Sequence, residues 1–278
     1  MTVDHLLDTS AFLDTDQSRV RGLFWAARRG HVDIVDKLLK ENTSPNVRVV
    51  NGSTALIAAS QLGRGDVVRI LLNKQGLISN DAGFRVNYAW RRGRTPLSLA
   101  ASNGFLGIVR QLLDHEHSLP DLPDSDQWTP LMYSAFGNHL DILQALLSNP
   151  RVSPNHVERT GRNALSWAAS EGHINIIKYL LSLQYMRVDE RDQSGRTALS
   201  WAAGSGHLDV VIALEQSGQI DISSRDNNGR NALSWACHGR QEKVVEYLIK
   251  YDRPGVDTED VDGWTPLAWA LSGNAPKT

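Results

Sequence analysis

Arginine side chains recur at a fixed spacing in this 278-residue chain, and each directly follows a glycine. The set comprises Arg94, Arg162, Arg196 and Arg230, and the last three lie 34 residues apart. Trp128 and Trp264 occupy the corresponding position in two further segments. A guanidinium group matches a carboxylate through paired hydrogen bonds, and large aromatic side chains often dominate an interface. We therefore expect a row that binds carboxylates of a partner, and a row of merely solvated charge is the alternative.

A second cluster of arginine and aromatic residues lies between residues 84 and 94. These eleven positions, FRVNYAWRRGR, hold four arginines, three aromatics and no acidic residue, which is typical of interfaces. The candidate binding residues here are Arg85, Tyr88, Trp90, Arg91, Arg92 and Arg94. Two alternatives stay open: a surface loop whose Phe84 and Trp90 form a small local core, or nucleic-acid binding through the same loop. A net charge of −2, from 29 basic and 31 acidic residues, argues against a broad nucleic-acid-binding surface.

Residue patterns that carry catalysis or hold metals are scarce. The sequence contains no phosphate-binding glycine loop after a strand and no His-Glu-x-x-His motif. Cys237 is the single cysteine, and it falls where another segment has Ala169, so we expect a buried packing residue. His115, Glu116 and His117 are a weak signal for a metal site. We predict no catalytic residue, metal or cofactor, with an enzyme or small-molecule site built in a groove as the alternative.

The elements that must position these residues follow from an internal repeat. A leucine recurs every 34 residues from Leu97 to Leu267. Leu56 precedes Leu97 by 41 residues, and Leu23 precedes Leu56 by 33. A fixed period of this size predicts stacked units, each of which buries its apolar face against its neighbours. We therefore expect one elongated array with an insertion at about residues 73–92.

Each repeat divides in the same way, as residues 160–195 illustrate. A turn at residues 160–162 is followed by an alanine-rich first helix at residues 163–170. Gly172 ends that helix, because glycine accepts the left-handed backbone beyond a helix end. The apolar spacing of residues 173–181 predicts an amphipathic second helix. A polar linker then places Asp192 and Gly195 at the first and fourth positions of a type I turn.

This layout resembles the ankyrin-repeat family. The resemblance is carried by Thr-Pro-Leu at residues 95–97, 129–131 and 265–267, and by Gly-His at residues 30–31, 172–173 and 206–207. It implies an all-α solenoid of about seven and a half repeats, each a helix–turn–helix plus a β-hairpin loop. Residues 22–278 would form this array, preceded by a capping or flexible segment at residues 1–21. The Leu-Ser-Trp-Ala version of the repeat is similar to arrays in large fungal ankyrin proteins.

The sequence departs from the family pattern at several positions. Serine replaces the family's histidine at Ser166 and its equivalents, where it can still hydrogen-bond locally, so we expect an unchanged fold. Arg240 stands where a glycine ends the first helix in other repeats. Either Gly239 adopts the left-handed conformation, or Arg240 carries a strain of about 1 kcal/mol. Glu215 replaces an apolar residue in a second helix, which we expect to pack less firmly.

Tryptophans also recur with the repeat period. They are Trp167, Trp201, Trp235 and Trp269, with Trp25 in the first repeat. The family usually has leucine at this position, so we expect enlarged core residues whose truncation leaves a cavity and costs about 3–5 kcal/mol. An exposed surface on which a base or a proline-rich peptide stacks is the alternative.

The resemblance implies a non-catalytic scaffold that binds a partner protein through the concave face and its hairpin tips. The arginines favour a partner with an acidic surface over nucleic acid. We expect a monomeric intracellular protein of the cytoplasm or nucleus without membrane attachment, because residues 1–10 lack a secretory pattern and no apolar run is long enough to span a bilayer. The half repeat after Gly263 is expected to be a polar cap of the array, and a fragment of a longer chain is the alternative.

Overall fold

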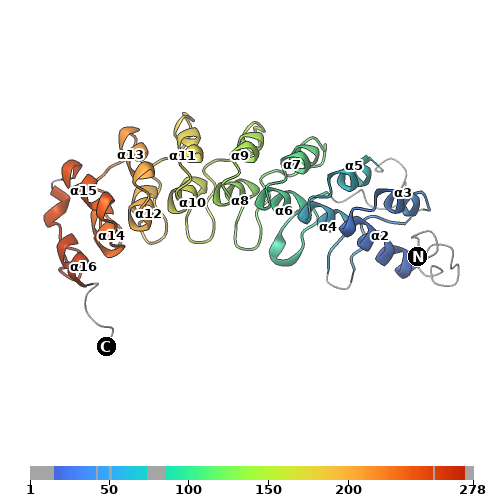
Figure 1. Cartoon of the computed structure of the whole chain (residues 1–278), viewed down its shortest axis with the longest axis horizontal. Helices are drawn as coiled ribbons and strands as arrows, with labels where there is room; N and C mark the ends of the chain where they lie inside the picture. The colour runs from blue at the N-terminus through green and yellow to red at the C-terminus, as the bar shows by residue number, and fades with distance from the viewer. Residues whose placement is uncertain (1–15, 42, 50–51, 74–85, 253, 273–278) are drawn as a thin grey trace. The chain divides into compact units, whose positions relative to one another are not determined.

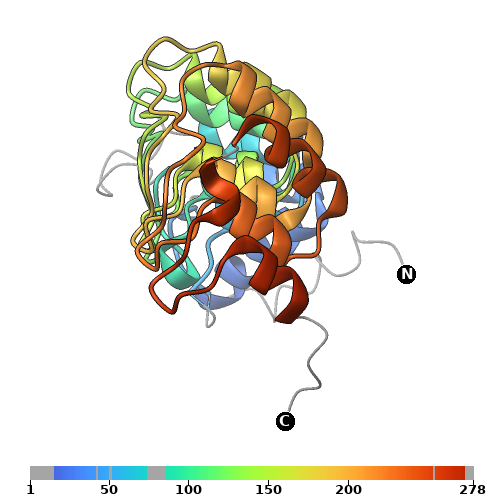
Figure 2. The same cartoon turned by 90° about the vertical axis from the view of Figure 1, so that its left-hand side faces the viewer.

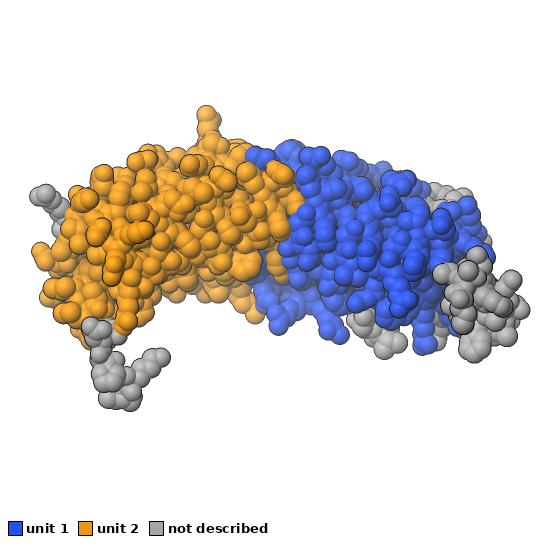
Figure 3. Space-filling view, viewed as in Figure 1, with its two compact units in different colours: residues 1–130, 144–152 blue, residues 131–143, 153–278 orange. Residues whose placement is uncertain are grey.

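The computed structural model describes residues 16–41, 43–49, 52–73, 86–252 and 254–272. Its contacts divide the chain into two compact units, shown in Figure 3. Unit 1 comprises residues 1–130 and 144–152, and unit 2 comprises residues 131–143 and 153–278. Both units are helical, and no β-strand occurs among the described residues. The expected hairpin of each repeat is therefore a hydrogen-bonded turn without a regular ladder.

Unit 1 is built from pairs of helices (Figure 1). The first helices are α2 (Asp16–Arg29), α4 (Ala55–Gln61) and α6 (Pro96–Ser102). The second helices are α3 (Val32–Lys40), α5 (Gly65–Asn73) and α7 (Leu106–Leu113), and a short 3-10 helix, η2 (Arg91–Gly93), precedes α6. First helices pack on first helices and second helices on second helices. Two of the three unit boundaries fall within α8 (Pro130–Phe136) and α9 (Leu140–Leu147), and the third follows Val152 in the linker after α9.

Unit 2 repeats the same arrangement. Its first helices are α10 (Ala164–Ser170), α12 (Ala198–Ser205), α14 (Ala232–His238) and α16 (Pro266–Ser272). Its second helices are α11 (Ile174–Leu181), α13 (Leu208–Gln216) and α15 (Glu242–Tyr251), followed by the 3-10 helix η3 (Pro254–Asp257). The first helices contact one another in sequence order, from α10 to α16. In Figure 2 the linkers between the yellow, orange and red helices of this unit gather on one side of them.

Side-chain caps explain where the first helices begin. Oδ1 of Asn163 accepts a hydrogen bond from the Ser166 amide at 2.9 Å, and Oγ1 of Thr95 accepts one from the Ser98 amide at 3.1 Å. Such caps satisfy amides that have no partner inside the helix. The Ser166 hydroxyl donates to Oδ1 of Asn163 at 3.0 Å, and the Ser98 hydroxyl donates to the Thr95 carbonyl at 2.9 Å. The expectation that serine bonds locally at the family's histidine position is confirmed.

Residues in the left-handed conformation separate the two helices of a repeat. Gly172 and Gly206 have φ values of 75° and 85°. Arg240 has φ 55°, whereas Gly239 has φ −78°. Arg240 therefore carries the strained backbone, and the alternative in which Gly239 takes over that conformation is wrong. Asn138 adopts φ 60° at the same position, which an asparagine tolerates more readily.

The apolar core of unit 2 lies between its first and second helices. On α11 the side chains of Ile176, Ile177 and Leu180 are fully buried, as the amphipathic spacing predicts. Alanines such as Ala202 fill the first-helix side of this core and let the helices approach closely. Glu215 lies at the edge of the core and accepts a hydrogen bond from the Tyr247 hydroxyl at 3.0 Å. The polar replacement at this position is thus satisfied by a neighbouring repeat.

The ends of the array differ from expectation. Helix α2 begins at Asp16, within the segment expected to be a separate cap, and residues 1–15 lie outside the described residues. At the other end, α16 leaves Leu267 and Leu271 66% and 64% exposed. The described outer face of α16 is therefore apolar, which a polar cap does not predict, and the role of this half repeat stays a prediction. Within the described ranges, every helix is too short or too polar to cross a bilayer.

Candidate functional site

Three turns between repeats of unit 2 are each shaped by one buried carboxylate. Oδ1 of Asp192 accepts hydrogen bonds from the amides of Ser194 and Arg196, both at 2.9 Å. The Gly195 amide donates to the Asp192 carbonyl at 2.8 Å, and Gly195 has φ 76°. A Cβ on Gly195 would lie 2.7 Å from the amide nitrogen of Asn227, so no other residue fits here without a shift. Asp226 and Asp260 build equivalent turns, which confirms the turn prediction.

Neighbouring turns are joined by backbone hydrogen bonds at their tips. In unit 2 the Gln193 amide donates to the Thr160 carbonyl, and the Asn227 amide donates to the Ser194 carbonyl, each at 2.9 Å. In unit 1 the Ser125 amide donates to the Arg92 carbonyl at 2.7 Å. These bonds hold adjacent turns in a fixed register. Side chains on the tips are therefore displayed from a rigid row.

Arginines and tryptophans of unit 2 alternate in a continuous series of face-to-face contacts. The guanidinium carbon of Arg162 lies 3.4 Å from the ring centre of Trp167 and 3.9 Å from that of Trp201. The guanidinium carbon of Arg196 lies 3.5 Å from the ring centre of Trp201 and 3.8 Å from that of Trp235. Arg230 continues the series between Trp235 and Trp269, at 5.4 and 4.2 Å. We call these residues the Arg–Trp stack: Trp167, Arg162, Trp201, Arg196, Trp235, Arg230 and Trp269.

The same aspartates that shape the turns also hold the indoles of the stack. The indole N–H of Trp201 donates to Oδ2 of Asp192 at 3.0 Å. Trp235 donates likewise to Asp226 at 3.0 Å, and Trp269 to Asp260 at 2.9 Å. Each carboxylate thus uses one oxygen for its turn and the other for an indole. This double role was not predicted, although the constant nine-residue spacing between Asp and Trp was visible in the sequence.

The guanidinium groups are anchored to the first helices. Nη2 of Arg162 donates to the Ser166 carbonyl at 3.0 Å and to the Ser170 hydroxyl at 2.7 Å. Nη2 of Arg196 donates to the Ser200 carbonyl at 3.1 Å. Burial lowers the pKa of Arg162 and of Arg196 to about 10, although the nearby Asp192 opposes that effect for both. Both side chains therefore stay charged at neutral pH.

This geometry argues against one alternative and corrects one expectation. Arg162 is only 6% exposed, so the arginines do not form a simple solvated row on the surface. The tryptophans are not core residues either: Trp201 is partly exposed and Trp25 is 52% exposed. An indole prefers this position because one face can stack on a cation while its N–H reaches a carboxylate. The core beneath is filled instead by Leu199 and by small side chains of α12.

The arginine-rich segment of unit 1 is described from Val86 onward, and Phe84 and Arg85 lie outside the described residues. Val86 is buried, whereas Tyr88 and Trp90 are partly exposed. The guanidinium carbon of Arg48 lies 3.7 Å from the ring centre of Tyr88. The Trp90 amide donates to the Arg94 carbonyl at 2.8 Å and closes the turn.

Two arginines at the tip of that turn project into solvent. Arg91 and Arg92 are both exposed, and Arg92 has φ 57°. Arg94 is half-buried at the foot of the turn, next to the capping Thr95. Of the two predicted tip tryptophans, Trp128 is partly exposed in unit 1, and Trp264 is 39% exposed in unit 2. The Trp264 ring lies 4.9 Å from that of Trp269, so it packs against the last member of the Arg–Trp stack.

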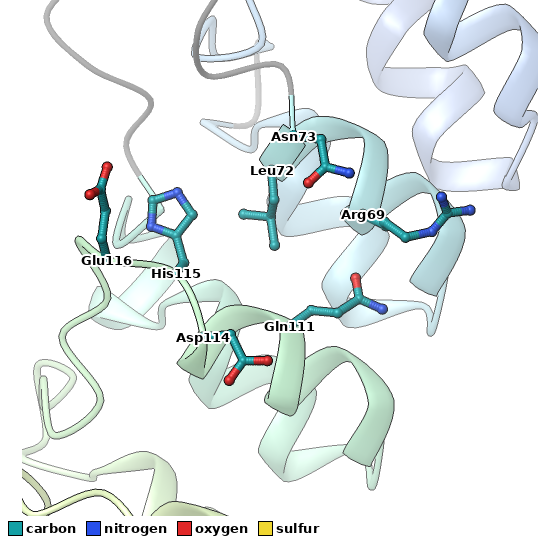
Figure 4. A pocket seen from close by; sticks show the side chains of 7 residues that line it. All are labelled: Arg69, Leu72, Asn73, Gln111, Asp114, His115 and Glu116. Atoms are coloured by element: carbon teal, nitrogen blue, oxygen red, sulfur yellow. The ribbon is translucent and has the colours of Figure 1, made fainter.

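The weaker chemical signals of the sequence are the segment from His115 to His117 and the single Cys237. Among the described residues, no group of three or more His, Cys, Asp or Glu side chains could hold a metal ion. His115 borders an open pocket of about 440 Å³ in unit 1, between the ends of α5 and α7 (Figure 4). Cys237 is buried, and desolvation raises the pKa of its thiol to about 11. The prediction that Cys237 is a packing residue is confirmed.

Comparison with known proteins identifies the fold family. A family model for ankyrin repeats matches residues 2–81, 75–157, 150–226 and 214–277, which together span nearly the whole chain. The chain belongs to the ankyrin-repeat family. The ankyrin repeat domain of human ASB11 is similar in structure, with a TM-score of 0.70 and 24% sequence identity, over 81% of this chain and 96% of that one. This structural similarity supports the fold alone.

Curated relatives of this ankyrin-repeat protein come from plants. It is 39% identical over 94 residues to the probable E3 ubiquitin-protein ligase XBOS33 of Oryza sativa subsp. japonica, a match that covers 33% of this chain and 16% of that protein. It is 35% identical over 108 residues to the E3 ubiquitin-protein ligase XBAT33 of Arabidopsis thaliana, covering 36% of this chain and 19% of that protein. The chain thus matches less than a fifth of the length of either relative.

Proposed function

We propose that this ankyrin-repeat protein is a non-catalytic scaffold that binds a partner protein through its turn tips and the adjoining first helices. The observation that carries the proposal is the backbone hydrogen bonding between neighbouring turns, such as that from Ser125 to the Arg92 carbonyl. A surface fixed in this way loses little conformational entropy when a partner binds. The partner-binding role of ankyrin repeats in general points the same way.

The proposed contact residues belong to both units. In unit 1 they are Tyr88, Trp90, Arg91, Arg92, Arg94 and Trp128, together with Arg85, which lies outside the described residues. On unit 2 they are Arg162, Arg196, Arg230 and Trp264. Their positive charge favours a partner with an acidic surface. Arg91 and Arg92 are the strongest candidates of unit 1, because both are exposed at a turn tip that backbone bonds hold in place.

The proposed scaffold is intracellular and monomeric, and ubiquitin-ligase activity is not part of its proposed function. The matched segments of the two ligases cover 16% and 19% of their lengths, so the rest of those proteins has no counterpart in the match. Nucleic-acid binding is the alternative class, and a steep loss of affinity with added salt would identify it.

The proposal is tested by reversing one exposed charge at a time. Tagged wild-type protein captures partners from cells of the source organism, and mass spectrometry identifies them. Arg91→Glu should reduce recovery of the principal partner by about tenfold or more, because an attractive contact becomes repulsive. Arg110→Glu is the matched control, since Arg110 is exposed on the second helix α7, away from the turns. Equal recovery by both folded variants would remove this site assignment.

A further inference from the structure

The Arg–Trp stack contains guanidinium groups whose hydrogen-bonding capacity is only partly used. Arg162 and Arg196 each donate through Nη2 to their own first helix. The Nε of both is buried and has no hydrogen-bond partner in the described part of the chain. No hydrogen bond to Nη1 of either residue occurs among the described residues, and neither Nη1 is among the fully enclosed unpartnered atoms, so each keeps some accessible surface for a ligand. Two guanidinium groups that contact the same Trp201 ring thus keep N–H donors without an acceptor among the described residues.

Most carboxylates close to these arginines already accept hydrogen bonds from turn amides or indoles, as Glu158, Asp192 and Asp226 do, whereas Glu171 accepts one from the Ser170 hydroxyl. Both oxygens of Asp192 are occupied, by two turn amides and by the Trp201 indole. Arg230 differs from the other two, because its Nε donates to Oδ2 of Asp260 at 3.3 Å. The stack therefore has two arginines that lack a carboxylate partner, followed by one that has found it within the chain. A carboxylate is the acceptor that a guanidinium edge binds most strongly.

The spacing of the two arginines selects the shape of the ligand. Their guanidinium carbons lie 3.9 and 3.5 Å from the centre of the same Trp201 ring, so they are no farther apart than those two distances together. In an extended peptide, side chains of alternate residues point to the same side and are separated by roughly 6.6 Å. Carboxylates at positions i and i+2 of a strand match this pair, whereas adjacent ones point to opposite sides.

We propose that the Arg–Trp stack binds an extended acidic peptide segment of a partner protein, with alternate carboxylates on Arg162 and Arg196. This inference rests on the proposed scaffold function and specifies the ligand chemistry of unit 2. The partly exposed indoles of Trp167, Trp201 and Trp235 offer apolar surface beside the charged donors, on which the intervening stems of the peptide pack. The two carboxylates of the peptide are matched by two guanidinium groups of the stack, so the site needs two acidic residues and not a long run of negative charge.

A polyphosphate chain fits this surface less well. Glu158, Glu171 and Asp192 lie close enough to Arg162 to raise its pKa by their charge. Phosphates on either side of the two arginines would approach these carboxylates and be repelled. A peptide with neutral residues flanking its two acidic residues avoids that repulsion. The observations therefore favour a protein partner over a nucleic acid at this surface.

The tryptophans of the stack supply a direct readout in the whole, unmodified protein. The probes are two short peptides of one composition, with blocked ends: in the first, two Glu residues are separated by one Thr, and in the second they are adjacent. Titration is followed by intrinsic tryptophan fluorescence and by calorimetry. The first peptide should bind at least about tenfold more tightly than its isomer. Equal affinities, or no binding of either peptide, would overturn the proposal without reliance on any variant.

Variants then locate the binding to the stack. Arg196→Gln should weaken binding of the first peptide by about tenfold or more, and Lys178→Gln, an equal charge change on the exposed side of α11, should leave it unchanged. Near-ultraviolet circular dichroism verifies that the variants are folded. Equal affinity in both variants overturns the site. If a single-stranded oligonucleotide binds more tightly than the first peptide, and its affinity falls steeply with added salt, the peptide proposal is overturned in favour of nucleic-acid binding.

The outcome is separable from that of the scaffold proposal. If Arg91→Glu reduces recovery of the partner but neither peptide binds, the scaffold function stands and the proposal of peptide binding at the Arg–Trp stack fails. If the first peptide binds as described while Arg91→Glu captures normally, the unit 1 assignment fails and the stack remains as the binding surface of unit 2.

Discussion

The indole N–H of Trp201 donates to Oδ2 of Asp192 at 3.0 Å, and this bond ties a first helix to the turn that precedes it. Oδ1 of the same carboxylate fixes the turn itself through the amides of Ser194 and Arg196. Turn shape and indole orientation are therefore coupled within each repeat. Because Trp201 also contacts Arg162, a residue of the preceding repeat, the coupling extends to that neighbouring repeat of unit 2.

Removal of the Asp192 carboxylate should lower the stability of the protein more than removal of an exposed carboxylate does. Asp192→Ala removes the acceptor of three hydrogen bonds at a buried site, and we expect a loss of about 2 kcal/mol in the free energy of unfolding. Urea unfolding followed by circular dichroism measures it. Glu246→Ala, which removes an exposed carboxylate on α15, is the control and should change stability by less than about 0.5 kcal/mol. Matching midpoints for the two variants would contradict the coupling.

Trp201→Ala should destabilise the protein by about 1–3 kcal/mol, less than the truncation of a core residue of that size. The side chain is partly exposed, so its loss leaves a surface depression with little enclosed cavity. Trp201→Phe keeps a ring for stacking but loses the N–H, and it should fall between the alanine variant and wild type. A loss of 4 kcal/mol or more in Trp201→Ala would restore the interpretation of this residue as core.

The helix pairs and the helix ends could be predicted from the sequence. The 34-residue period was enough to predict the helix pairs, as α10 and α11 show, because periodicity and capping residues report local structure. The strained Arg240 was predicted as one of two alternatives. These features depend on residues close together in sequence.

The Arg–Trp stack was not predicted, because it depends on contacts between repeats. Arg162 reaches Trp201, a residue of the next repeat, and the sequence alone does not say which way either side chain points. Leucine at this position in related repeats suggested core packing for tryptophan. The paired columns of Arg and Trp, each with the same period, were the signal that could have indicated alternate stacking.

Arg240→Gly should stabilise the protein by about 0.5 kcal/mol. Glycine removes a left-handed strain of about 1 kcal/mol, and its greater freedom in the unfolded chain offsets part of that gain. Arg240 is exposed, so little packing is lost. Lys243→Gly is the comparison, since Lys243 is exposed within α15, and it should destabilise by about 1 kcal/mol. A lower melting temperature for Arg240→Gly would contradict the strain.

Cys237 should make stability fall at alkaline pH. Desolvation raises the pKa of its thiol from 9.0 to about 11, so the unfolded chain loses the proton first. The unfolded state then binds fewer protons than the folded state, and the contribution of this group to stability declines as pH rises from 9.0 toward 11. Cys237→Ala removes the titrating group and places there the residue found at Ala169 and Ala203.

Urea midpoints of wild type and Cys237→Ala, measured at intervals between neutral pH and pH 11, test this linkage. The two curves should run parallel below pH 9 and then converge or cross, because wild type alone loses the contribution of the thiol. Any packing deficit of the alanine variant is independent of pH and only offsets the curves. A constant difference across the whole range would show that the thiol is as accessible to ionisation in the folded protein as in the unfolded chain.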